Sequence, residues 1–414
     1  MPSSNKMRLM IVGASVRALA MSAVKGGYGV DAFDMFADWD TKKFLAPTDS
    51  LTRISKFEDV LGYKSWADCD GAIIAGGMEN RIGLVAEIEK QIPILGSASE
   101  NRVRLADAPS VFEVLKQNGL QVPASKSQLG DSDDPVKWLS KNAMSSGGLS
   151  VNFANELDDS KDKLGNYFQK LINGGCMSAV MVGAADKASC VGVSLQLVGN
   201  PEFGASSFQY CGSVGPIHLS AEKLDVIQRI GNVLVREFGI KGLFGFDFIN
   251  NSDGVFPIDI NPRVTASAEL YESAFGHDGE IKSLIDLHVK SCSGGFLIED
   301  KKLFSLETYS QVEAKIILFN RFDEAIAITD DITERIYAMI DSQFFQAQAA
   351  GFTLADLPCV GEVIDPRHPI LTLRIRFQKR SGELGVLKLI DESRGKAEEI
   401  YSLISSGRID QVSP

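Results

Sequence analysis

The sequence has no paired cysteines, no excess of positive charge and no long apolar run, and each absence excludes a class of protein. Its six cysteines are scattered, with no CxxC pair and no histidine at metal-ligand spacing. We therefore expect reduced core thiols in a cytoplasmic protein. Lys and Arg number 42 against 54 Asp and Glu, giving a net charge of −12. Because binding to a phosphate backbone needs a basic field, we expect no nucleic-acid partner.

Two further signals are missing near the N-terminus. The apolar stretch 9–12 is followed at once by a glycine, so it is too short for a signal segment or a membrane span, and we expect no membrane partner. Residues 13–18 read Gly-Ala-Ser-Val-Arg-Ala, which lacks the G-x-G-x-x-G fingerprint of nicotinamide and flavin sites. The first strand therefore gives little support to a dinucleotide-binding function.

The composition is that of a folded protein, and the length of 414 residues predicts about three domains. The first hundred residues alternate between apolar strands and helices, which predicts an α/β domain with an open parallel sheet. The expected strands are 9–12, 30–34 and 71–77, with a short one at 94–96; the expected helices are 16–26, one from residue 82, and an amphipathic one at 104–119.

The strongest local signal is a pair of strands at 243–250 and 255–263. Alternation in the second strand puts Asp259, Asn261 and Arg263 on one face. If 252–254 forms a three-residue hairpin loop, Asp247 in the first strand lies opposite Asp259. Two carboxylates and an amide oxygen suit Mg²⁺ shared with phosphates, so Asp247, Asp259 and Asn261 are our candidate metal ligands. The alternative is a solvated strand face.

A lysine strand and a small-residue loop lie about a hundred residues earlier. Lys141 is followed by Ser145-Ser146-Gly147-Gly148. Serines and glycines let backbone N–H groups approach phosphate oxygens, and a lysine supplies a point charge. The alternative is an ordinary hairpin turn.

A third segment runs from Gln169 through Lys170 to Leu171 and then into glycines. Such an extended connector can offer N–H and C=O groups to an adenine edge, with Leu171 against the ring. Alone, it would be read as a plain inter-strand loop.

The order of these segments resembles the ATP-grasp superfamily over nearly the whole chain. The resemblance implies a Rossmann-like pre-ATP-grasp domain at 1–104, an ATP-grasp domain at 105–300 with a hinge near 167–175, and a small C-terminal α+β domain at 310–414. That last domain is similar to the biotin-carboxylase type through 314–318 and 356–358.

The same resemblance assigns roles to individual residues. Residues 259–263, Asp-Ile-Asn-Pro-Arg, look like the Glu-x-Asn-Pro-Arg motif, which implies metal ligands and catalytic roles for Asn261 and Arg263. Lys141 and the loop 145–148 match the ATP-phosphate site, and 169–171 match the adenine hinge. The implied cofactors are ATP and Mg²⁺.

Two positions depart from the family pattern. Asp259 stands where many members have Glu, and Asp107-Ala108 stands where many have an Asp-Lys pair. Arg102 or Arg104 is a candidate replacement for that missing lysine.

Residues 76–80 and 261–270 resemble a narrower branch that includes tyramine–glutamate ligases of methanofuran-type, one-carbon cofactor pathways. The branch implies a substrate site at Glu79 and Asn80, although helix capping explains them equally well.

The expected function is an ADP-forming carboxylate–amine ligase that activates an acid, glutamate being one candidate, as an acyl phosphate. Its partners would be small molecules, an acid and an amine, and a homodimer fits the architecture by resemblance. One alternative is an ATP-dependent carboxylase of the biotin-carboxylase type. Another is an ATP-binding protein without turnover.

Overall fold

Four parallel strands form the N-terminal sheet of this computed structural model, in the order β3-β2-β1-β4. The structure describes residues 6–78, 80–142, 145–157, 166–275, 279–294, 311–340, 351–378 and 383–409. The strands are β1 (Arg8–Gly13), β2 (Gly29–Asp34), β3 (Ser50–Arg53) and β4 (Gly71–Ile74), and the helices of this region are α1 (Arg17–Gly26), α2 (Trp39–Phe44) and α3 (Ile82–Glu89). The predicted α/β fold of the N-terminal region is therefore confirmed, and the strand expected at 94–96 is reduced to a parallel bridge between Ala72 and Ile94.

The single helix expected at 104–119 is wrong. The chain forms α4 (Ser99–Ala106) and then α5 (Ala108–Gln117), with Asp107 between them. The Asp107 side chain accepts a hydrogen bond from the backbone N–H of Ser110, and Pro109 lies in the first turn of α5. An N-cap aspartate followed by proline starts a new helix, so amphipathic spacing across the junction was misleading.

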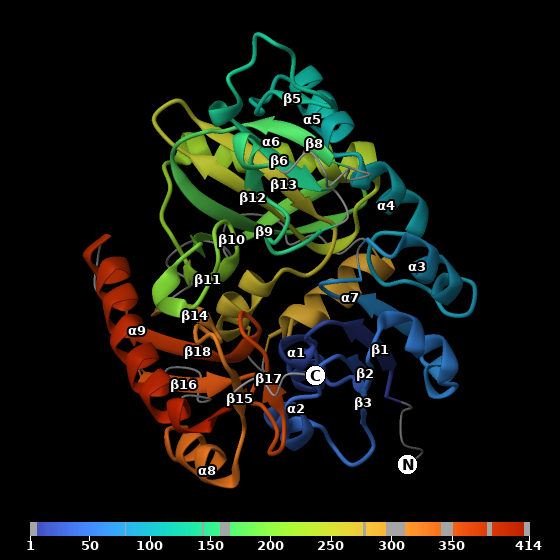
Figure 1. The fold of residues 1–414 in the computed structure, drawn as a ribbon. Helices are drawn as coiled ribbons and strands as arrows, with labels where there is room; N and C mark the ends of the chain where they lie inside the picture. Colours follow the sequence, from blue (N-terminus) through green and yellow to red (C-terminus); the bar gives the residue numbers. More distant parts are fainter. Residues whose placement is uncertain are drawn as a thin grey trace.

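An eight-stranded antiparallel sheet extends through the rest of the molecule, in the order β13-β12-β9-β10-β11-β14-β18-β16 (Figure 1). Its strands are β9 (Gly175–Ala184), β10 (Lys187–Val198), β11 (Tyr210–Gly215), β12 (Gly242–Asn250), β13 (Val255–Asn261), β14 (Gln311–Phe319), β16 (Gly351–Ala355) and β18 (Pro369–Gln378). Strands from both sides of residue 300 thus share one sheet. Helix α6 (Ala221–Phe238) packs on the β9–β12 part, and α9 (Glu383–Ile404) packs on the β14–β18 part.

Two smaller sheets complete the described elements. A four-stranded antiparallel sheet has the order β5-β8-β6-β7, and a three-stranded one has the order β17-β15-β19. Their strands are β5 (Ser125–Lys126), β6 (Trp138–Asn142), β7 (Asn152–Phe153), β8 (Asn166–Lys170), β15 (Ala325–Ala327), β17 (Val363–Ile364) and β19 (Arg408–Ile409); the remaining helices are α7 (Leu284–Gly294) and α8 (Asp330–Ala338).

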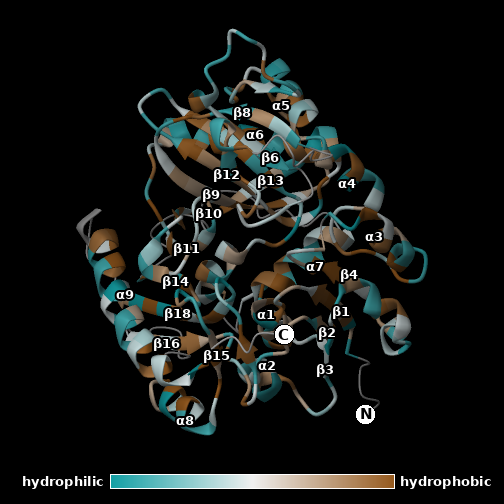
Figure 2. Ribbon diagram, in the orientation of Figure 1, coloured by the Kyte–Doolittle hydropathy of each residue, from teal (hydrophilic) through white to brown (hydrophobic). Residues whose placement is uncertain are grey.

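The hydrophobic core connects the N-terminal sheet to the large sheet. One cluster of buried side chains includes Leu9 and Ile11 of β1, Val180 and Val182 of β9, and Leu284 of α7. Figure 2 shows these central segments as hydrophobic and the outer loops as mostly hydrophilic. This shared core fixes the N-terminal sheet against the strands that carry the candidate site.

Within the described residues, no helix has the length and apolarity needed to cross a membrane.

Candidate functional site

The acidic strand pair is an antiparallel hairpin in which Asp247 lies opposite Asp259. The loop is not the three-residue turn considered from the sequence, because Asn250 pairs with Val255 and leaves 251–254 as the loop. A β-bulge between Asp247 and Phe248 shifts the register by one residue, so that Ile258 has no partner of its own. The bulge corrects for the longer loop and brings the two carboxylates opposite each other.

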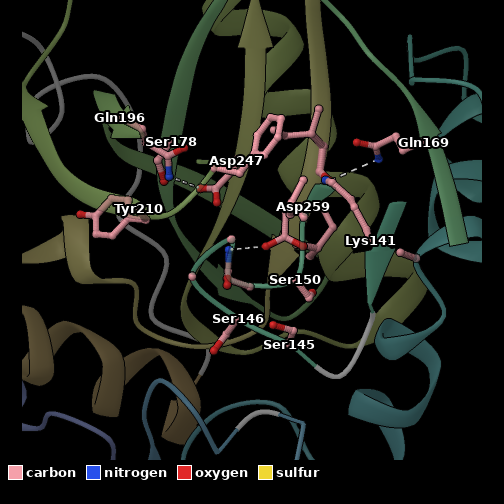
Figure 3. Close-up of a pocket in the computed structure, with 18 of the residues that line it drawn as sticks. Lys141, Ser145, Ser146, Ser150, Gln169, Ser178, Gln196, Tyr210, Asp247 and Asp259 are labelled. Atoms are coloured by element: carbon pink, nitrogen blue, oxygen red, sulfur yellow. Dashed lines mark hydrogen bonds between the residues drawn. The ribbon is translucent and has the colours of Figure 1, made fainter. Parts of the chain in front are cut away.

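The bulge also leaves a backbone oxygen available to side chains. The carbonyl of Ile258 accepts a hydrogen bond from Lys141 Nζ at 2.8 Å and one from Gln169 Nε2 at 3.4 Å. Lys141 is only 9% exposed, and burial lowers the pKa of its ammonium, opposed by Asp259 and Asp247. An ammonium has three donors, so the bond to Ile258 leaves two. Lys141 is therefore held against the acidic hairpin from the facing sheet (Figure 3).

Asp247 is surrounded by neutral donors. Gln196 Nε2 donates to its Oδ1 at 2.8 Å, and the hydroxyl of Ser178 also bonds to it. Burial, followed by the charge of Asp259, raises the pKa of Asp247 to about 6, although Gln196, Ser178 and Arg263 lower it. Two carboxylates of like charge repel each other when burial shields them from water. The pair therefore favours a bound cation.

Asn261 and Arg263 continue from Asp259 along the same segment. Asn261 Nδ2 donates to Asp259 Oδ2 at 3.3 Å, and Arg263 Nη2 donates to Asn261 Oδ1 at 3.1 Å. An amide oxygen has two lone pairs, so Asn261 keeps one for another ligand. The Arg263 guanidinium also lies beside Gly76, whose added Cβ would be 3.6 Å from its Cζ. Arg263 thus lies where the hairpin meets the end of β4.

The glycine-rich loop is attached to the start of β11. The carbonyl of Gly147 accepts from the backbone N–H of Tyr210 at 3.0 Å. Gly148 has a φ of +78°, and a Cβ there would lie 1.9 Å from the carbonyl oxygen of Phe208. Only glycine fits such a position. The loop therefore has a defined path along one wall of the site, with Ser145 and Ser146 preceding it.

The adenine hinge differs in part from the expectation. The backbone N–H of Lys170 donates to Ala124 O at 2.8 Å, and that of Leu171 donates to Lys137 O at 2.9 Å. These two N–H groups are used within the protein, so an adenine contact at Lys170 and Leu171 would rely on their carbonyl groups and on the Leu171 side chain. Ile172 follows them and also lines the cavity.

One cavity of about 430 Å³ brings the predicted residues together. It lies between the β5-β8-β6-β7 sheet and the β13-β12-β9-β10 part of the large sheet (Figure 3). The predicted residues that line it are Asn80, Lys141, Ser145, Ser146, Gly147, Gly148, Gln169, Lys170, Leu171, Asp247, Asp259, Asn261 and Arg263. Glu79 lies outside the described residues. A volume of this size is typical of a small-molecule site.

Of the two arginines considered as a replacement for the missing lysine, Arg102 lines the cavity. It is 3% exposed, and its Nε donates to Ser97 O at 3.0 Å. Arg104 instead packs its guanidinium over the ring of Phe238, 5.0 Å from the centroid. The position of the Arg102 side chain in the cavity therefore favours Arg102 as the replacement for the missing lysine.

Among the polar residues of the wall that the sequence did not predict are Ser178, Gln196 and Tyr210, on β9, β10 and β11. Figure 3 shows them beside Asp247. The available signal was weak: Ser178 is a single serine in an apolar strand, and Gln196 is one of several polar residues in β10. The register between distant strands decides that they face Asp247, and spacing along the chain does not reveal it.

Residues 105–267 match the sequence profile of the ATP-grasp domain family. No curated protein matches the chain in sequence. Among solved structures, the chain is similar to N5-carboxyaminoimidazole ribonucleotide synthetase from Thermotoga maritima, with 14% identity and a TM-score of 0.63 over 95% of this chain and 98% of that one.

Two further structures are similar. A putative ATP-grasp superfamily protein from Archaeoglobus fulgidus has 19% identity and a TM-score of 0.52, over 76% of this chain and 94% of that one. The biotin carboxylase domain of 2-oxoglutarate carboxylase from Hydrogenobacter thermophilus has 12% identity and a TM-score of 0.67, over 93% and 88%. At these identities the likeness shows the fold. The chain therefore has the fold of these ATP-grasp structures, and its residues 105–267 match the ATP-grasp domain family.

Proposed function

We propose that the protein is an ADP-forming ligase that uses ATP and Mg²⁺ to activate a carboxylic acid as an acyl phosphate and join it to an amine. The observation that carries the proposal is the single cavity in which Asp247 and Asp259 face Lys141 and Arg263. Oxygen ligands and cationic side chains together suit phosphoryl transfer from a nucleotide.

The donor set fits magnesium. Asp247, Asp259 and Asn261 offer hard oxygen ligands on adjacent strands. Burial first, and then the charge of Asp259, raise the pKa of Asp247, and a bound cation would favour its ionised form. Within the described residues no group of three or more His, Cys, Asp or Glu forms a metal cluster. Two carboxylates and one amide leave positions for nucleotide phosphates and water, which is the usual arrangement for this ion. Bound there, the metal would neutralise phosphate charge.

The remaining roles belong to the protein's own side chains. Lys141, fixed through Ile258, would contact phosphate oxygens, and Arg102 would supply a second cation from the opposite wall. Arg263 would bind the transferred phosphoryl group. The backbone of 145–148 would cover the phosphates, and Leu171 with Ile172 would pack against the adenine. Asn80 would contact the acid or amine at the end of the N-terminal sheet.

The domain division at 1–104, 105–300 and 310–414, the homodimer and the cytoplasmic location belong to the same proposal. The solved biotin carboxylase domain that the chain resembles is described as a dimer in complex with MgADP, ADP and bicarbonate. Glutamate as the acid, and a place in one-carbon cofactor synthesis, rest on residues 76–80 and 261–270 alone.

A carboxylase is the second candidate. The observation that favours it is the likeness over nearly the whole chain to a carboxyaminoimidazole ribonucleotide synthetase and to a biotin carboxylase domain. In that case bicarbonate would replace the organic acid at the same metal site.

The test is incubation with ATP, Mg²⁺, hydroxylamine and a panel of acids that includes glutamate. We expect a hydroxamate together with ADP. Formation of AMP and pyrophosphate would contradict the proposed chemistry, and ADP formation that depends strictly on bicarbonate would establish the carboxylase instead. The absence of ATP turnover with every acid, with Asp247 and Asp259 intact, would support a binding protein.

A further inference from the structure

Gln196 lies two strands away from Asp247 and still bonds to it. It belongs to β10, Asp247 belongs to β12, and β9 lies between them. Its Nε2 reaches across β9 and donates to Asp247 Oδ1 at 2.8 Å (Figure 3). A long side chain held in this way loses rotamer freedom, and a second hydrogen bond would help to offset that loss.

That support comes from Cys176 on β9. The Cys176 thiol donates to Gln196 Oε1 at 3.0 Å, and burial raises the pKa of the thiol to about 12, so it stays protonated at neutral pH. An S–H group facing the amide oxygen directs the amide nitrogen toward Asp247, because the reverse orientation would place two oxygens together. The three residues therefore form a directed chain from thiol to amide to carboxylate.

The donor at Asp247 is neutral, which matters for a carboxylate that has to attract a cation. A lysine or arginine in the same place would pair with Asp247 and cancel its charge. An amide fixes one oxygen of the carboxylate and leaves the negative charge in place. Ser178 acts in the same way from β9.

We propose that Gln196, oriented by Cys176, is a positioning residue that holds Asp247 by one carboxylate oxygen and presents the other to the nucleotide-bound metal ion. The inference rests on the proposed function, since it requires Asp247 to be a metal ligand. In this proposal Cys176 orients Gln196 and does not act as a nucleophile.

The experiment measures Mn²⁺, used in place of Mg²⁺, on the full chain. Its affinity in the presence of ADP is followed through the electron paramagnetic resonance signal of free Mn²⁺, and the affinity for metal-free ADP is measured by calorimetry. We expect Gln196→Leu to weaken Mn²⁺ binding by about 10- to 100-fold, the usual effect of removing a group that orients a metal ligand. The affinity for metal-free ADP should not change. Gln311→Leu is the matched control, because Gln311 is a buried glutamine of the same sheet that does not line the cavity.

The cysteine provides an independent pair of variants. Cys176→Ala removes the donor to Gln196 and should weaken Mn²⁺ binding less than Gln196→Leu does. Cys176→Ser keeps a donor and should restore the affinity. Equal Mn²⁺ affinities in the two cysteine variants would overturn the proposal even if Gln196→Leu failed to fold.

Asp247→Asn separates this inference from the function on which it rests. If Asp247→Asn loses Mn²⁺ and Gln196→Leu does not, the positioning role is wrong and the metal site stands. If neither variant loses Mn²⁺, the metal assignment itself is wrong.

Discussion

Asp247 and Glu269 are both enclosed carboxylates, and their surroundings shift their pKa values in opposite directions. Burial raises the pKa of each. At Asp247 the neighbouring charge of Asp259 adds to this rise, and the pKa reaches about 6. At Glu269 the charges of Arg17, Arg374 and Lys315 outweigh burial, and the pKa lies well below its usual range.

The cations around Glu269 come from distant parts of the chain. Arg17 Nη1 and Nη2 each lie 2.9 Å from a Glu269 oxygen, and Lys315 and Arg374 each approach to 2.7 Å. Arg17 opens α1, whereas Lys315 and Arg374 belong to β14 and β18. Glu269 therefore joins the N-terminal region to the end of the large sheet, just after the segment that carries Arg263.

The contrast separates a carboxylate that is paired with cations inside the protein from one that is a candidate ligand of a bound cation. Glu269 has its cations within the protein and needs nothing from outside. Gln196 and Ser178, which bond to Asp247, are neutral and leave its negative charge in place. A buried carboxylate that lies beside a second carboxylate in a cavity is a candidate for cation binding.

The largest expected effect is on turnover. Asp259→Asn removes one of the two facing charges with little change in volume, and we expect the rate to fall by roughly a thousandfold or more, since a metal contributes several kcal/mol to the transition state. Steady-state assays at saturating Mg²⁺ check this, with circular dichroism to confirm the fold. A variant that keeps most of the wild-type rate would rule out Asp259 as a ligand.

Removing the ion pairs of Glu269 should destabilise the protein. Glu269→Ala leaves buried cations without their partner, and we expect the free energy of unfolding to fall by about 3–5 kcal/mol. Urea denaturation measures the loss. Glu398→Ala is the control, because its ion pair with Arg321 is exposed and should contribute about 0–1 kcal/mol. Equal losses in the two variants would contradict the role of burial.

Removing the charge of Asp247 should raise the free energy of unfolding, whereas removing that of Glu269 should lower it. The folded-state pKa of Asp247, about 6, lies above the ordinary value near 4, so stability is lost as the pH rises through that interval. We expect Asp247→Asn to stabilise the metal-free protein by at most about 3 kcal/mol at pH 8, and to give no gain below pH 4. Melting temperatures across this pH range test it. A destabilised variant at pH 8 would mean that the site is not strained by repulsion.

Nucleotide affinity should depend on Lys141. Lys141→Ala removes the charge-assisted contact to a phosphate that we propose, and we expect ATP binding to weaken by about 1.5–3 kcal/mol in calorimetry. Lys137→Ala is the control, since Lys137 is exposed and does not line the cavity. If ATP affinity is unchanged in both variants, Lys141 does not bind phosphate, and the segment 145–148 is an ordinary turn.

A smaller effect should distinguish the two arginines. Arg102→Ala should weaken ATP binding by about 1.5 kcal/mol, because Arg102 lines the cavity but already spends one donor on Ser97. Arg104→Ala should leave the affinity unchanged. If Arg104→Ala is the weaker binder, the assignment from side-chain position is wrong.

Local patterns predicted a good part of the fold. Strands β1, β2 and β4 followed from short apolar runs that end in glycine or polar residues, whereas β3 (Ser50–Arg53) was not predicted. The helix break at Asp107 was missed because one cap outweighed a continuous amphipathic pattern. The hairpin register came out right although its loop was wrong, since the bulge at Ile258 compensated for one extra loop residue.

The sequence alone determined which residues of the acidic hairpin share a face, because Asp247, Asp259, Asn261 and Arg263 are joined by a short loop and alternate along two strands. It also showed that the loop 145–148 follows Lys141, about a hundred residues before the acidic hairpin. Only the tertiary structure decided that the Ile258 carbonyl would hold Lys141, that Gln196 would reach Asp247 across β9, and that Arg17 would meet Glu269. Those contacts join residues 117, 51 and 252 positions apart in the chain, and the packing of whole sheets and helices, rather than the spacing of nearby residues, fixes such distances.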